Sequence, residues 1–376
     1  MTTTLDTVVI GGGAMGSAAA WALARRGRDV TLLEQFGPGH RIGASHGATR
    51  NLNLAYSDPH YVAMLAESVA LWHELETDGG EQLLARTEVV NHGTDPRLGD
   101  VQAALLAAGL RAEFLTAAEA AERWRGIRFD QHVLHMPDGG QLNPDLALPV
   151  MQRLAAGNGA VIRHRSKVVE LAILDDGVRL TVDVDGRTER FAARQAIVTA
   201  GGWTSKLLAG VPGLPRLTVT QEQPVHFAVT DDGAVWPGFN HSPGQGAEYA
   251  SWYSPVYGMP TPGEGIKAGW HGVGPEVDPD RRSFAPEPQQ RAALQDYARR
   301  WLPGVDADSL TDISCTYTTT ADENFVLDRI GPVVIGAGFS GHGFKFTPVV
   351  GRILADLATG EGPAPTIFSA SRPGVR

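Results

Sequence analysis

Residues 7–34 read TVVIGGGAMGSAAAWALARRGRDVTLLE, and this stretch decides the fold. The apolar run at 7–10 predicts a buried strand, the alanine-rich segment at 14–26 a helix, and the apolar run at 30–33 a second strand. Glycines at positions 11, 13 and 16 connect the first strand to the helix in the spacing G-x-G-x-x-G. This order defines a βαβ unit of the dinucleotide-binding type.

Each residue of this motif has its own physical reason. Gly11 permits the tight turn, Gly13 lets backbone N–H groups approach a pyrophosphate, and Gly16 lets the helix pack closely on the strand. The helix N-terminus favours the anion. Glu34 ends the second strand 18 residues after Gly16 and is expected to accept hydrogen bonds from a ribose, which disfavours the 2′-phosphate of NADP. The motif alone leaves both FAD and NAD open.

The rest of the chain is expected to add helices, further buried strands, an antiparallel sheet and a loop-rich tail. Helices are expected at 59–76, 143–156, 286–301 and 348–358, buried parallel strands at 161–169 and 195–199, and a further buried strand at 333–335. Alternating short strands with Gly/Pro turns from about 217 to 273 predict an antiparallel sheet. Thr347 is expected to cap the last helix, with Pro348 at its first position. The Gly/Pro-rich tail from 360 onward is expected on the surface.

These patterns predict an α/β plus antiparallel β protein with two discontinuous domains. The Rossmann-like nucleotide-binding domain comprises residues 1–82, 145–214 and 322–376. It is interrupted by a substrate domain, built on the antiparallel sheet, that comprises residues 83–144 and 215–321.

Composition excludes several classes of protein. The 376 residues include 32 basic and 42 acidic side chains, a formal net charge of −10. This acidic excess is not typical of a nucleic-acid-binding protein or of a protein with a polybasic membrane-binding patch. The single cysteine, Cys315, excludes an intrachain disulfide framework and multi-cysteine metal centres. No apolar run approaches the ~18 residues that span a bilayer and no signal sequence is visible, so we expect a soluble cytoplasmic protein. No metal site is expected, because His132 and His135 lack a partner at ligand spacing.

A second glycine-rich stretch, VVIGAGFSGHGFK at 333–345, bears on the choice of cofactor. It reads as a strand that leads through glycines into a helix, whose dipole offers positive potential at the helix mouth. A flavin reduced to its anion needs such stabilisation, whereas a nicotinamide ring does not. The alternative is a plain glycine-rich connection.

Three further segments could carry chemistry. Residues 265–271 alternate, so that Lys267, Gly269 and His271 share a face with room for a flat ligand, although an edge strand with a solvated face would read the same way. Cys315 and Tyr317 also share a strand face, and the cysteine could be an inert buried thiol or a point of attachment or attack. Residues 43–47 match the hydrolase motif G-x-S-x-G, but neither a strand nor a clear helix flanks them.

Together these residues resemble the family of monomeric sarcosine oxidase and N-methyltryptophan oxidase, amino-acid-oxidase-like flavoproteins that include bacterial fructosyl amino acid oxidases. The resemblance runs over most of the chain. It rests on the motif at 11–16, SHGATR at 45–50, GIK at 265–267 with His271, CTYT at 315–318, DENF at 322–325, the stretch 338–346 and the tail at 368–373.

The resemblance implies that FAD binds in the Rossmann-like domain through a thioether to Cys315. It implies that Lys267 lies by flavin N5, through water, and promotes oxygen reduction. Arg50 resembles the family's arginine that raises the electron affinity of the flavin, and Lys345 resembles the lysine that pairs with the substrate carboxylate. His271 and Tyr317 resemble residues that line the family's substrate pocket. The expected cofactor contacts are Gly11, Gly13, Gly16, Glu34, Ser45, His46, Thr49, Val168, Cys315, Gly341, Gly343 and Lys345. The expected catalytic residues are Lys267, Arg50, His271 and Tyr317, and the expected substrate contacts are Asn53, Lys345 and Tyr257.

One position departs from the family pattern. Sarcosine-specific members carry a second arginine three positions after the one matching Arg50, and here that position is Asn53. Losing a charged partner of a partly desolvated carboxylate costs about 1.5–3 kcal/mol of binding. An amide can instead hydrogen-bond hydroxyl groups, so we expect a secondary amino acid with a bulkier substituent, such as a fructosyl or N-methyl amino acid.

The expected reaction is oxidation of a secondary amine by hydride transfer to FAD, followed by imine hydrolysis and reoxidation by O2 to H2O2. The partners are then an amino-acid-type substrate and O2, and the chain is expected to act as a monomer. Two alternatives remain open: a flavin dehydrogenase that uses another electron acceptor, and a non-catalytic FAD- or NAD-binding module.

Overall fold

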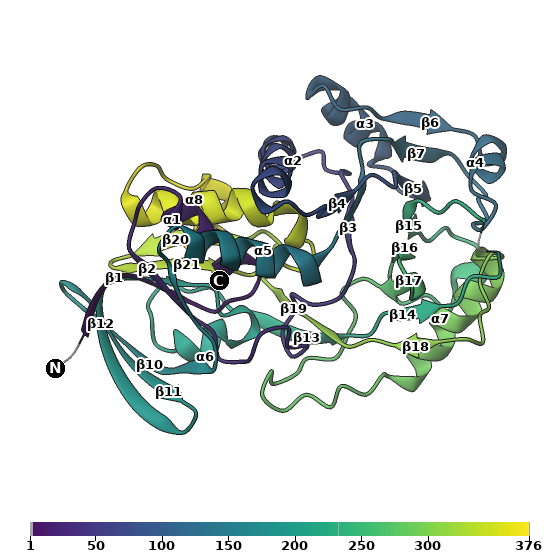
Figure 1. Ribbon diagram of the computed structural model, residues 1–376. Coiled ribbons are helices and arrows are strands. Elements are labelled where there is room, and N and C mark those ends of the chain that lie inside the picture. The colour runs from purple at the N-terminus through teal and green to yellow at the C-terminus, as the bar shows by residue number, and fades with distance from the viewer. Residues whose placement is uncertain (1–2, 232, 376) are drawn as a thin grey trace.

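The computed structural model describes residues 3–231 and 233–375, and it consists of two large sheets that lie side by side (Figure 1). Elements from both ends of the chain, purple and yellow in Figure 1, together with the teal segment of residues 144–198, build the part around the first sheet. Blue and green elements from the middle of the chain build the part around the second. The predicted combination of an α/β part and an antiparallel β part is therefore confirmed.

The first sheet is a parallel core with antiparallel additions. Strand β1 (Thr3–Ile10) lies between β2 (Val30–Leu33) and β12 (Arg187–Val198), and both neighbours run parallel to it. Further parallel pairs join β2 to β9 and β12 to β21, and the antiparallel additions are β10, β11 and β20. The bounds of these five strands are Val161–Arg163, Ser166–Leu174, Gly177–Val184, Val326–Ile330 and Val333–Ala337, in order from β9.

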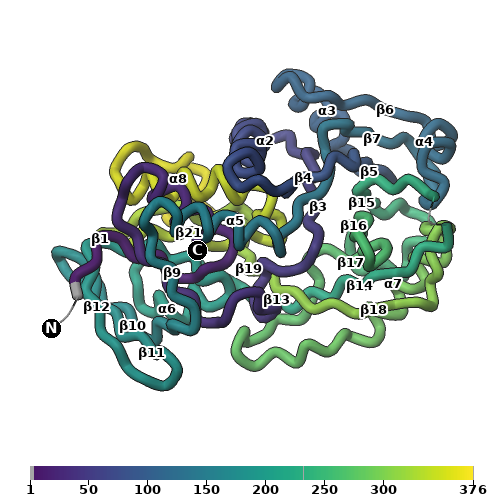
Figure 2. The backbone as a smooth tube through the Cα atoms, in the orientation of Figure 1, coloured from purple at the N-terminus to yellow at the C-terminus, as the bar shows by residue number. Residues whose placement is uncertain are grey.

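Small residues allow the helices to cover this sheet closely. Helix α1 (Ala14–Ala24) is buried along its whole length and packs against α5 (Pro144–Gly157) and α8 (Thr347–Thr359). A Cβ atom at Gly351 would lie 2.5 Å from the backbone of Ala18, so glycine sets the distance between α1 and α8. The longer α2 (Pro59–Gly79) packs on α8 and α5, and Figure 2 shows α2, α5 and α8 gathered on one side of the sheet.

Three local predictions are wrong. Residues 161–169 do not form one parallel strand, because Arg165 has φ +53° and the chain turns there from β9 into the antiparallel β10. Thr347 does not cap α8: Phe346 is the cap residue, and the Thr347 hydroxyl donates to the Phe344 carbonyl instead. The predicted helix at 14–26 ends two residues early, at Ala24, before the basic pair.

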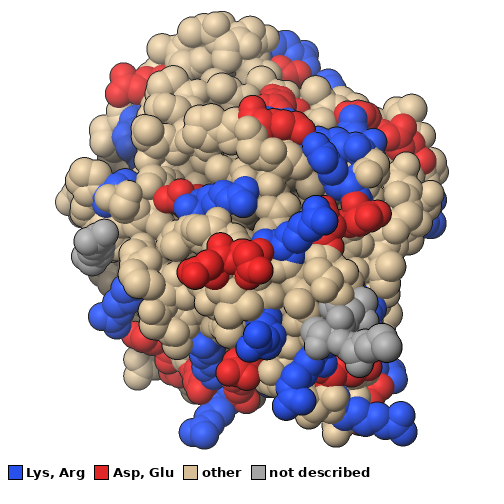
Figure 3. Space-filling view, turned by 90° about the vertical axis from the view of Figure 1, so that its left-hand side faces the viewer, with Lys and Arg blue, Asp and Glu red and all other residues tan. Residues whose placement is uncertain are grey.

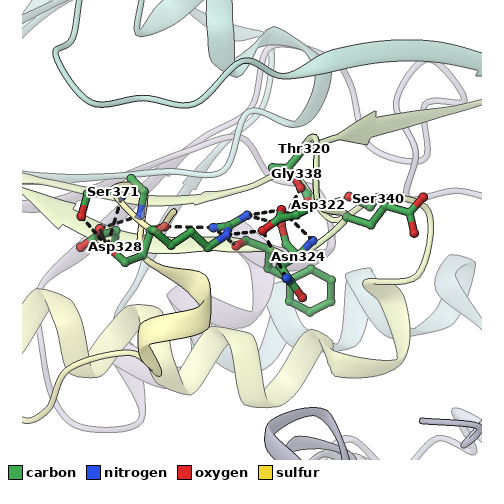
Figure 4. A network of polar contacts seen from close by, with 12 residues as sticks. Thr320, Asp322, Asn324, Asp328, Gly338, Ser340 and Ser371 are labelled. Atoms are coloured by element: carbon green, nitrogen blue, oxygen red, sulfur yellow. Dashed lines mark hydrogen bonds and ion pairs between the residues drawn. The ribbon is translucent and has the colours of Figure 1, made fainter. Parts of the chain in front are cut away.

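Only part of the tail lies on the surface, because polar contacts hold it against the protein and bury Phe368, Ala370 and Arg372. Arg372 is 8% exposed and makes a two-pronged ion pair with Asp322, in which both N···O distances are 2.7 Å. This pairing holds the pKa of the Asp322 carboxyl well below its usual range. Figure 4 shows the network, with Asp322 and Asn324 at one end and Asp328 and Ser371 at the other. Phe368 is completely buried beside these contacts. The DENF and tail segments of the sequence therefore bind each other.

The second sheet is antiparallel except at one pair. Its strand order is β18-β14-β17-β16-β15-β5-β7-β6, and only β15 and β5 run parallel among these described neighbours. Helix α7 (Pro288–Trp301) packs against an aromatic core on one face of the sheet. In the order given, the strands span Thr311–Asp312, Val225–Phe227, Gly265–Trp270, Val256–Thr261, Gly238–Ser242, Val89–Gly93, Val133–Met136 and Glu113–Leu115.

Two small sheets and short helices complete the described chain. Strands β3 (Arg50–Leu52), β8 (Gly140–Leu142) and β4 (Leu84–Ala85) form one small sheet, and β13 (Thr218–Glu222) pairs with β19 (Cys315–Thr319) in the other. Both lie between the two large sheets (Figures 1 and 2). The remaining α-helices are α3, α4 and α6, which span Leu98–Ala107, Ala117–Arg123 and Thr204–Leu207.

The surface mixes charges of both signs. The face drawn in Figure 3, at the side of the first sheet, carries intermixed basic and acidic side chains. Elsewhere along the chain, Arg163 pairs with Glu189 at 2.9 Å, and a partly exposed pair of this kind contributes at most about 1 kcal/mol. Among the helices of residues 3–231 and 233–375, none has the length and apolar character needed to cross a membrane.

Candidate active site

Two adjoining cavities lie between the large sheets. The first has a volume of about 440 Å3 and runs along the carboxyl ends of β1 and β2. The second has a volume of about 820 Å3 and lies against the second sheet. Both are lined by the same five residues where they meet: Arg50, Cys315, Tyr317, Gly341 and Phe344. The site therefore has a nucleotide-sized groove, a junction and a larger chamber.

The groove holds the glycine motif in the expected conformation. Gly11 has φ +101°, and a Cβ atom at Gly16 would lie 1.8 Å from the Gly11 carbonyl oxygen, so both positions require glycine. Gly16 supports the turn without lining the cavity. The buried carboxylate of Glu34 accepts hydrogen bonds from the backbone N–H groups of Gly12 at 2.6 Å and Phe36 at 2.8 Å. It also faces the groove, as does Val168.

The segment at 43–47 lines one wall of the groove and contacts the start of α1. It lies in an irregular stretch between β2 and β3, and the Ser45 hydroxyl accepts a hydrogen bond of 3.0 Å from the backbone N–H of Ala14, at the start of α1. The strand–turn–helix context of a hydrolase nucleophile is absent from this described segment, so the hydrolase alternative is rejected. Ser45 instead holds the helix N-terminus that faces the groove.

At the junction, a cysteine, an arginine and a tyrosine come together. The Cys315 thiol lies 4.0 Å from Nη2 of Arg50 and 3.8 Å from the Ala44 carbonyl oxygen. Arg50 is fixed by hydrogen bonds of 2.8 Å to the carbonyl oxygens of Thr49 and Ala44. A Cβ atom at Gly341, where φ is +78°, would lie 2.2 Å from the Tyr317 ring, so this glycine makes room for the tyrosine. Cys315 thus opens onto both cavities.

Strand β17 presents Lys267 to the chamber, as its alternation predicts. Ile266, Ala268 and Trp270 belong to the aromatic core, whereas Lys267 and His271 line the chamber. The edge-strand alternative is wrong, because β17 lies between β14 and β16. The Lys267 ammonium donates to the Thr49 carbonyl at 3.2 Å and the Thr49 hydroxyl at 3.1 Å. Burial and, to a lesser degree, Arg50 lower the pKa of Lys267 to about 7.

A continuous chain of polar contacts leads from Lys267 toward solvent. The hydroxyls of Thr49 and Thr261 lie 2.8 Å apart, and Nε2 of His226 lies 3.2 Å from the Thr261 hydroxyl. Nδ1 of the same histidine lies 3.0 Å from the Glu264 carboxylate, whose side chain is 46% exposed. No motif in the sequence marks Thr261, His226 or Glu264.

A second buried lysine faces the same chamber. Lys345, in the short helix η3 (Phe344–Phe346), donates to the Tyr56 hydroxyl at 3.0 Å and to the His342 carbonyl at 3.1 Å. Burial lowers its pKa to about 7. The Tyr56 hydroxyl is also 2.9 Å from Nδ1 of His342. The family segment at 338–346 contained His342, but nothing in the sequence placed Tyr56 beside it.

Tyrosine and histidine form another wall of the chamber. The Tyr317 hydroxyl lies 3.3 Å from Nδ1 of His271. Tyr257 lies over Gly269, where a Cβ atom would be 2.9 Å from the tyrosine hydroxyl. Burial raises the pKa of both tyrosines and lowers that of His271. These groups are therefore neutral hydrogen-bonding partners at neutral pH.

Asn53 forms an amide pair. Its Nδ2 donates to Oδ1 of Asn91 at 3.3 Å, and Nδ2 of Asn91 donates back to Oδ1 of Asn53 at 3.2 Å. Asn240, the register neighbour of Asn91, lines the same chamber. This wall offers amide donors and acceptors in place of a guanidinium.

Most of the expected residues line one of the two cavities, but some of the expected cofactor contacts line the chamber instead of the groove. His46, Thr49 and Lys345 line the chamber and not the groove, and Gly343 lines the groove. Nε2 of His46 lies 3.2 Å from the Ser314 carbonyl, and burial lowers the pKa of His46 to about 4.

This fold and site define a class of protein. The family model described as FAD dependent oxidoreductase matches residues 6–357, and the chain belongs to this family. The glycine cradle, the buried Glu34 carboxylate and the adjoining junction fit a dinucleotide that ends in a flat ring, so the residues present fit FAD.

Within this family, the chain is similar to named oxidases. It is 32% identical to monomeric sarcosine oxidase from Bacillus sp. (strain B-0618), covering 100% of this chain and 98% of the relative. It is 34% identical to peroxisomal sarcosine oxidase from Mus musculus (94% and 92% covered) and 30% identical to N-methyl-L-tryptophan oxidase from Citrobacter koseri (96% of each covered). Among solved structures, the open form of NikD, an unusual amino acid oxidase, matches with a TM-score of 0.84 at 26% identity, covering 98% of both chains. The resemblance read from the sequence is confirmed, and the chain is an FAD-dependent oxidoreductase of the amino-acid oxidase type.

Proposed function

We propose that this chain oxidises the secondary amine of an N-substituted amino acid and passes the electrons to O2. The amine loses two electrons and two protons to become an imine, which water hydrolyses to a carbonyl fragment and a primary amine, while O2 gains two electrons and two protons to become H2O2. Bound FAD supplies the two-electron relay between these half-reactions. The observation that carries the proposal is that two buried lysines, Lys345 and Lys267, face one chamber next to the junction with the groove.

Lys345 is the proposed partner of the substrate carboxylate. Its ammonium is already oriented by Tyr56 and the His342 carbonyl, and its pKa of about 7 leaves it ready to become fully charged when an anion arrives. A neutral Tyr317 and His271 can hydrogen-bond the amine in its neutral form. Because a neutral amine already carries its lone pair, no side chain has to act as general base.

Lys267 is the proposed partner of oxygen. An ammonium in a desolvated site stabilises the negative charge that develops as O2 is reduced. The contacts through Thr49, Thr261 and His226 to Glu264 offer a path that returns a proton to Lys267 after each turnover. Each hydroxyl in this chain can accept from one neighbour and donate to the next.

Cys315 is the proposed point of covalent attachment of FAD. Its thiol opens onto both cavities and lies 4.0 Å from the guanidinium of Arg50. The same guanidinium supports a flavin that gains electrons. A thioether to the cofactor gives this lone cysteine a role that an inert core thiol would not have.

The amide wall and the size of the chamber support a substrate larger than sarcosine. Asn53 and Asn91 present paired donors and acceptors that suit hydroxyl groups, and the chamber of about 820 Å3 leaves space beyond a small amino acid. Fructosyl amino acids and bulky N-methyl amino acids are the candidates. N-methyl-L-tryptophan is the substrate named for one group of relatives, which supports the second class.

A substrate panel tests the proposal. Formation of H2O2 is measured with sarcosine, N-methyl-L-tryptophan and fructosyl-glycine, in wild type and in Asn53→Arg. We expect one of the bulky substrates to give the highest kcat/KM in wild type, and the arginine variant to shift the ratio toward sarcosine. A far higher kcat/KM for sarcosine in wild type would overturn the substrate assignment. Loss of flavin colour without H2O2 in air would favour a dehydrogenase with another acceptor.

We further propose that the chain acts as a monomer with the domain division 1–82, 145–214 and 322–376 against 83–144 and 215–321. Membership of the two large sheets supports this division, since the strands of the first fall in the former ranges and those of the second in the latter. Small-angle scattering and sedimentation of the holoenzyme test the monomer.

A further inference from the structure

Behind the amide wall of the chamber lies a pair of buried histidines. Strands β5 and β15 run parallel, with Asn91 opposite Asn240 and His92 opposite His241. Because side chains alternate along a strand, the asparagines face the chamber and the histidines point to the other side of the sheet. There His241 lies among the rings of Tyr249, Trp252, Tyr297 and Trp301.

These histidines lack the partners that buried polar groups normally have. His92 is 1% exposed and His241 is not exposed, and their rings stack with centroids 3.8 Å apart. Neither ring nitrogen of His92, nor Nε2 of His241, has a hydrogen-bond partner within the part of the chain that the structure describes. Buried nitrogens of this kind are costly, and they indicate a bound group that the protein atoms do not supply.

A carboxylate completes a ligand set. Asp130 contributes an oxygen, and one ligand atom from each of Asp130, His92 and His241 lies within 4.8 Å of the other two. The two imidazoles and one carboxylate form a nitrogen- and oxygen-donor set that suits a divalent transition metal, Zn2+ above all among ions without redox chemistry.

The surrounding contacts match those of a metal site. Oδ2 of Asp130 accepts a hydrogen bond of 2.6 Å from the Tyr249 hydroxyl, and Nδ1 of His241 lies 3.4 Å from the Tyr297 hydroxyl. Metal ligands are commonly held by such outer partners, which fix the tautomer of the histidine and leave its other nitrogen for the metal.

We propose that His92, His241 and Asp130 bind one Zn2+ ion that braces β5 against β15. This is the one parallel pair among the described strands of an otherwise antiparallel sheet, and parallel pairing is slightly less stable per residue. A metal that joins the two strands holds Asn91 and Asn240 in place on the opposite face. The site is independent of the proposed function, since no metal takes part in that reaction.

The test uses the tag-free holoenzyme, stripped with chelator and then incubated with one equivalent of Zn2+. After gel filtration, elemental analysis is expected to find close to one zinc per chain. Asp130→Asn is the test variant, because the residue is exposed and the amide oxygen of asparagine can still accept the hydrogen bond from Tyr249. The matched control is Asp100→Asn, an exposed aspartate on α3. Removal of the ligand should weaken zinc binding by about 100-fold or more, and the control should bind like wild type.

Two further measurements keep the proposal open to refutation. Zn2+ is expected to raise the melting temperature of wild type and of Asp100→Asn, but not of Asp130→Asn. Co2+ in the same site should give the visible absorption of a four-coordinate ion without a thiolate charge-transfer band, which separates this site from Cys315. Absence of zinc from wild type, or equal zinc in both variants, would overturn the proposal and leave water as the partner of the histidines.

Discussion

Replacing Lys267 with methionine removes a buried charge and keeps most of the apolar stem. The side chain is 6% exposed, and its pKa falls from 10.5 to about 7 chiefly because of burial. At about 1.4 kcal/mol per pKa unit, this drop corresponds to a cost of roughly 5 kcal/mol for keeping the charged form in the folded protein. That figure is an upper bound for the stability gained by Lys267→Met, since the variant also loses two hydrogen bonds to Thr49.

The sign of the effect depends on pH. At pH 6 the lysine is charged in both the folded and the unfolded chain, so the full cost is present. Between pH 7 and 10.5 the folded chain loses the proton first, and the cost disappears. Lys267→Met should therefore melt at a higher temperature than wild type at pH 6, and the difference should shrink by pH 9.5.

The same variant should lose its reaction with oxygen. An ammonium about 4 Å from a developing oxygen anion contributes about 4 kcal/mol at an effective dielectric constant of 20, which corresponds to roughly a 1,000-fold change in rate. Stopped-flow mixing of the reduced enzyme with O2 should show a loss of this order, whereas anaerobic reduction by substrate should change much less. In wild type, reoxidation should slow as the pH rises through about 7, where Lys267 loses its proton.

Lys345→Met is the matched control. It removes a second buried lysine whose pKa is also about 7, so its effect on stability should be similar. Its kinetic effect should be opposite: a higher KM and slower reduction, with reoxidation largely retained. Equal losses in both half-reactions for both variants, or a Lys267→Met protein that is less stable than wild type at pH 6, would refute the reasoning.

Three other changes probe the junction and the tail. Cys315→Ala should release the flavin into the supernatant after acid precipitation, whereas wild type should keep it in the pellet. Gly341→Ala places a methyl group 2.2 Å from the Tyr317 ring, so in a Cys315→Ala background, where FAD binds without a covalent bond, absorbance titration with FAD should show at least a 10-fold weaker affinity; unchanged affinity would argue against this contact. Asp322→Asn removes the negative charge that pairs with buried Arg372 and should lower the free energy of unfolding by about 3 kcal/mol. The loss is measured as a lower melting temperature and as earlier proteolysis of the tail.

The nucleotide-binding part was predictable because its signals are local. The glycines at 11, 13 and 16 and the acidic Glu34 lie within one βαβ unit, and their spacing alone predicted the turn that they form. The alternation around Lys267 placed the lysine and His271 on one face for the same reason. The five predicted helices match α1, α2, α5, α7 and α8 to within three residues at each end, since apolar periodicity and caps such as Asn143 are read over a single turn. The shorter α3, α4 and α6 were not predicted.

The rest depended on contacts between distant segments. Tyr56 meets Lys345 and His342 across 286 or more positions, and no periodicity records that pairing. The Gly/Pro-rich tail was expected on the surface, but a bidentate contact with Asp322 buries Arg372 within it. Residues 161–169 were read as one strand because both ends of the segment are apolar, whereas the turn at Arg165 depends on backbone geometry.

The central claim is that the chamber oxidises a secondary amine of an N-substituted amino acid. Anaerobic mixing of the purified holoenzyme with each member of the substrate panel, followed by admission of air, tests it most directly. The account predicts that a bulky N-substituted amino acid bleaches the visible flavin absorbance within one turnover, and that air restores it with one H2O2 per flavin. A flavin that stays oxidised with every secondary amine, yet bleaches with primary amino acids, would contradict the account.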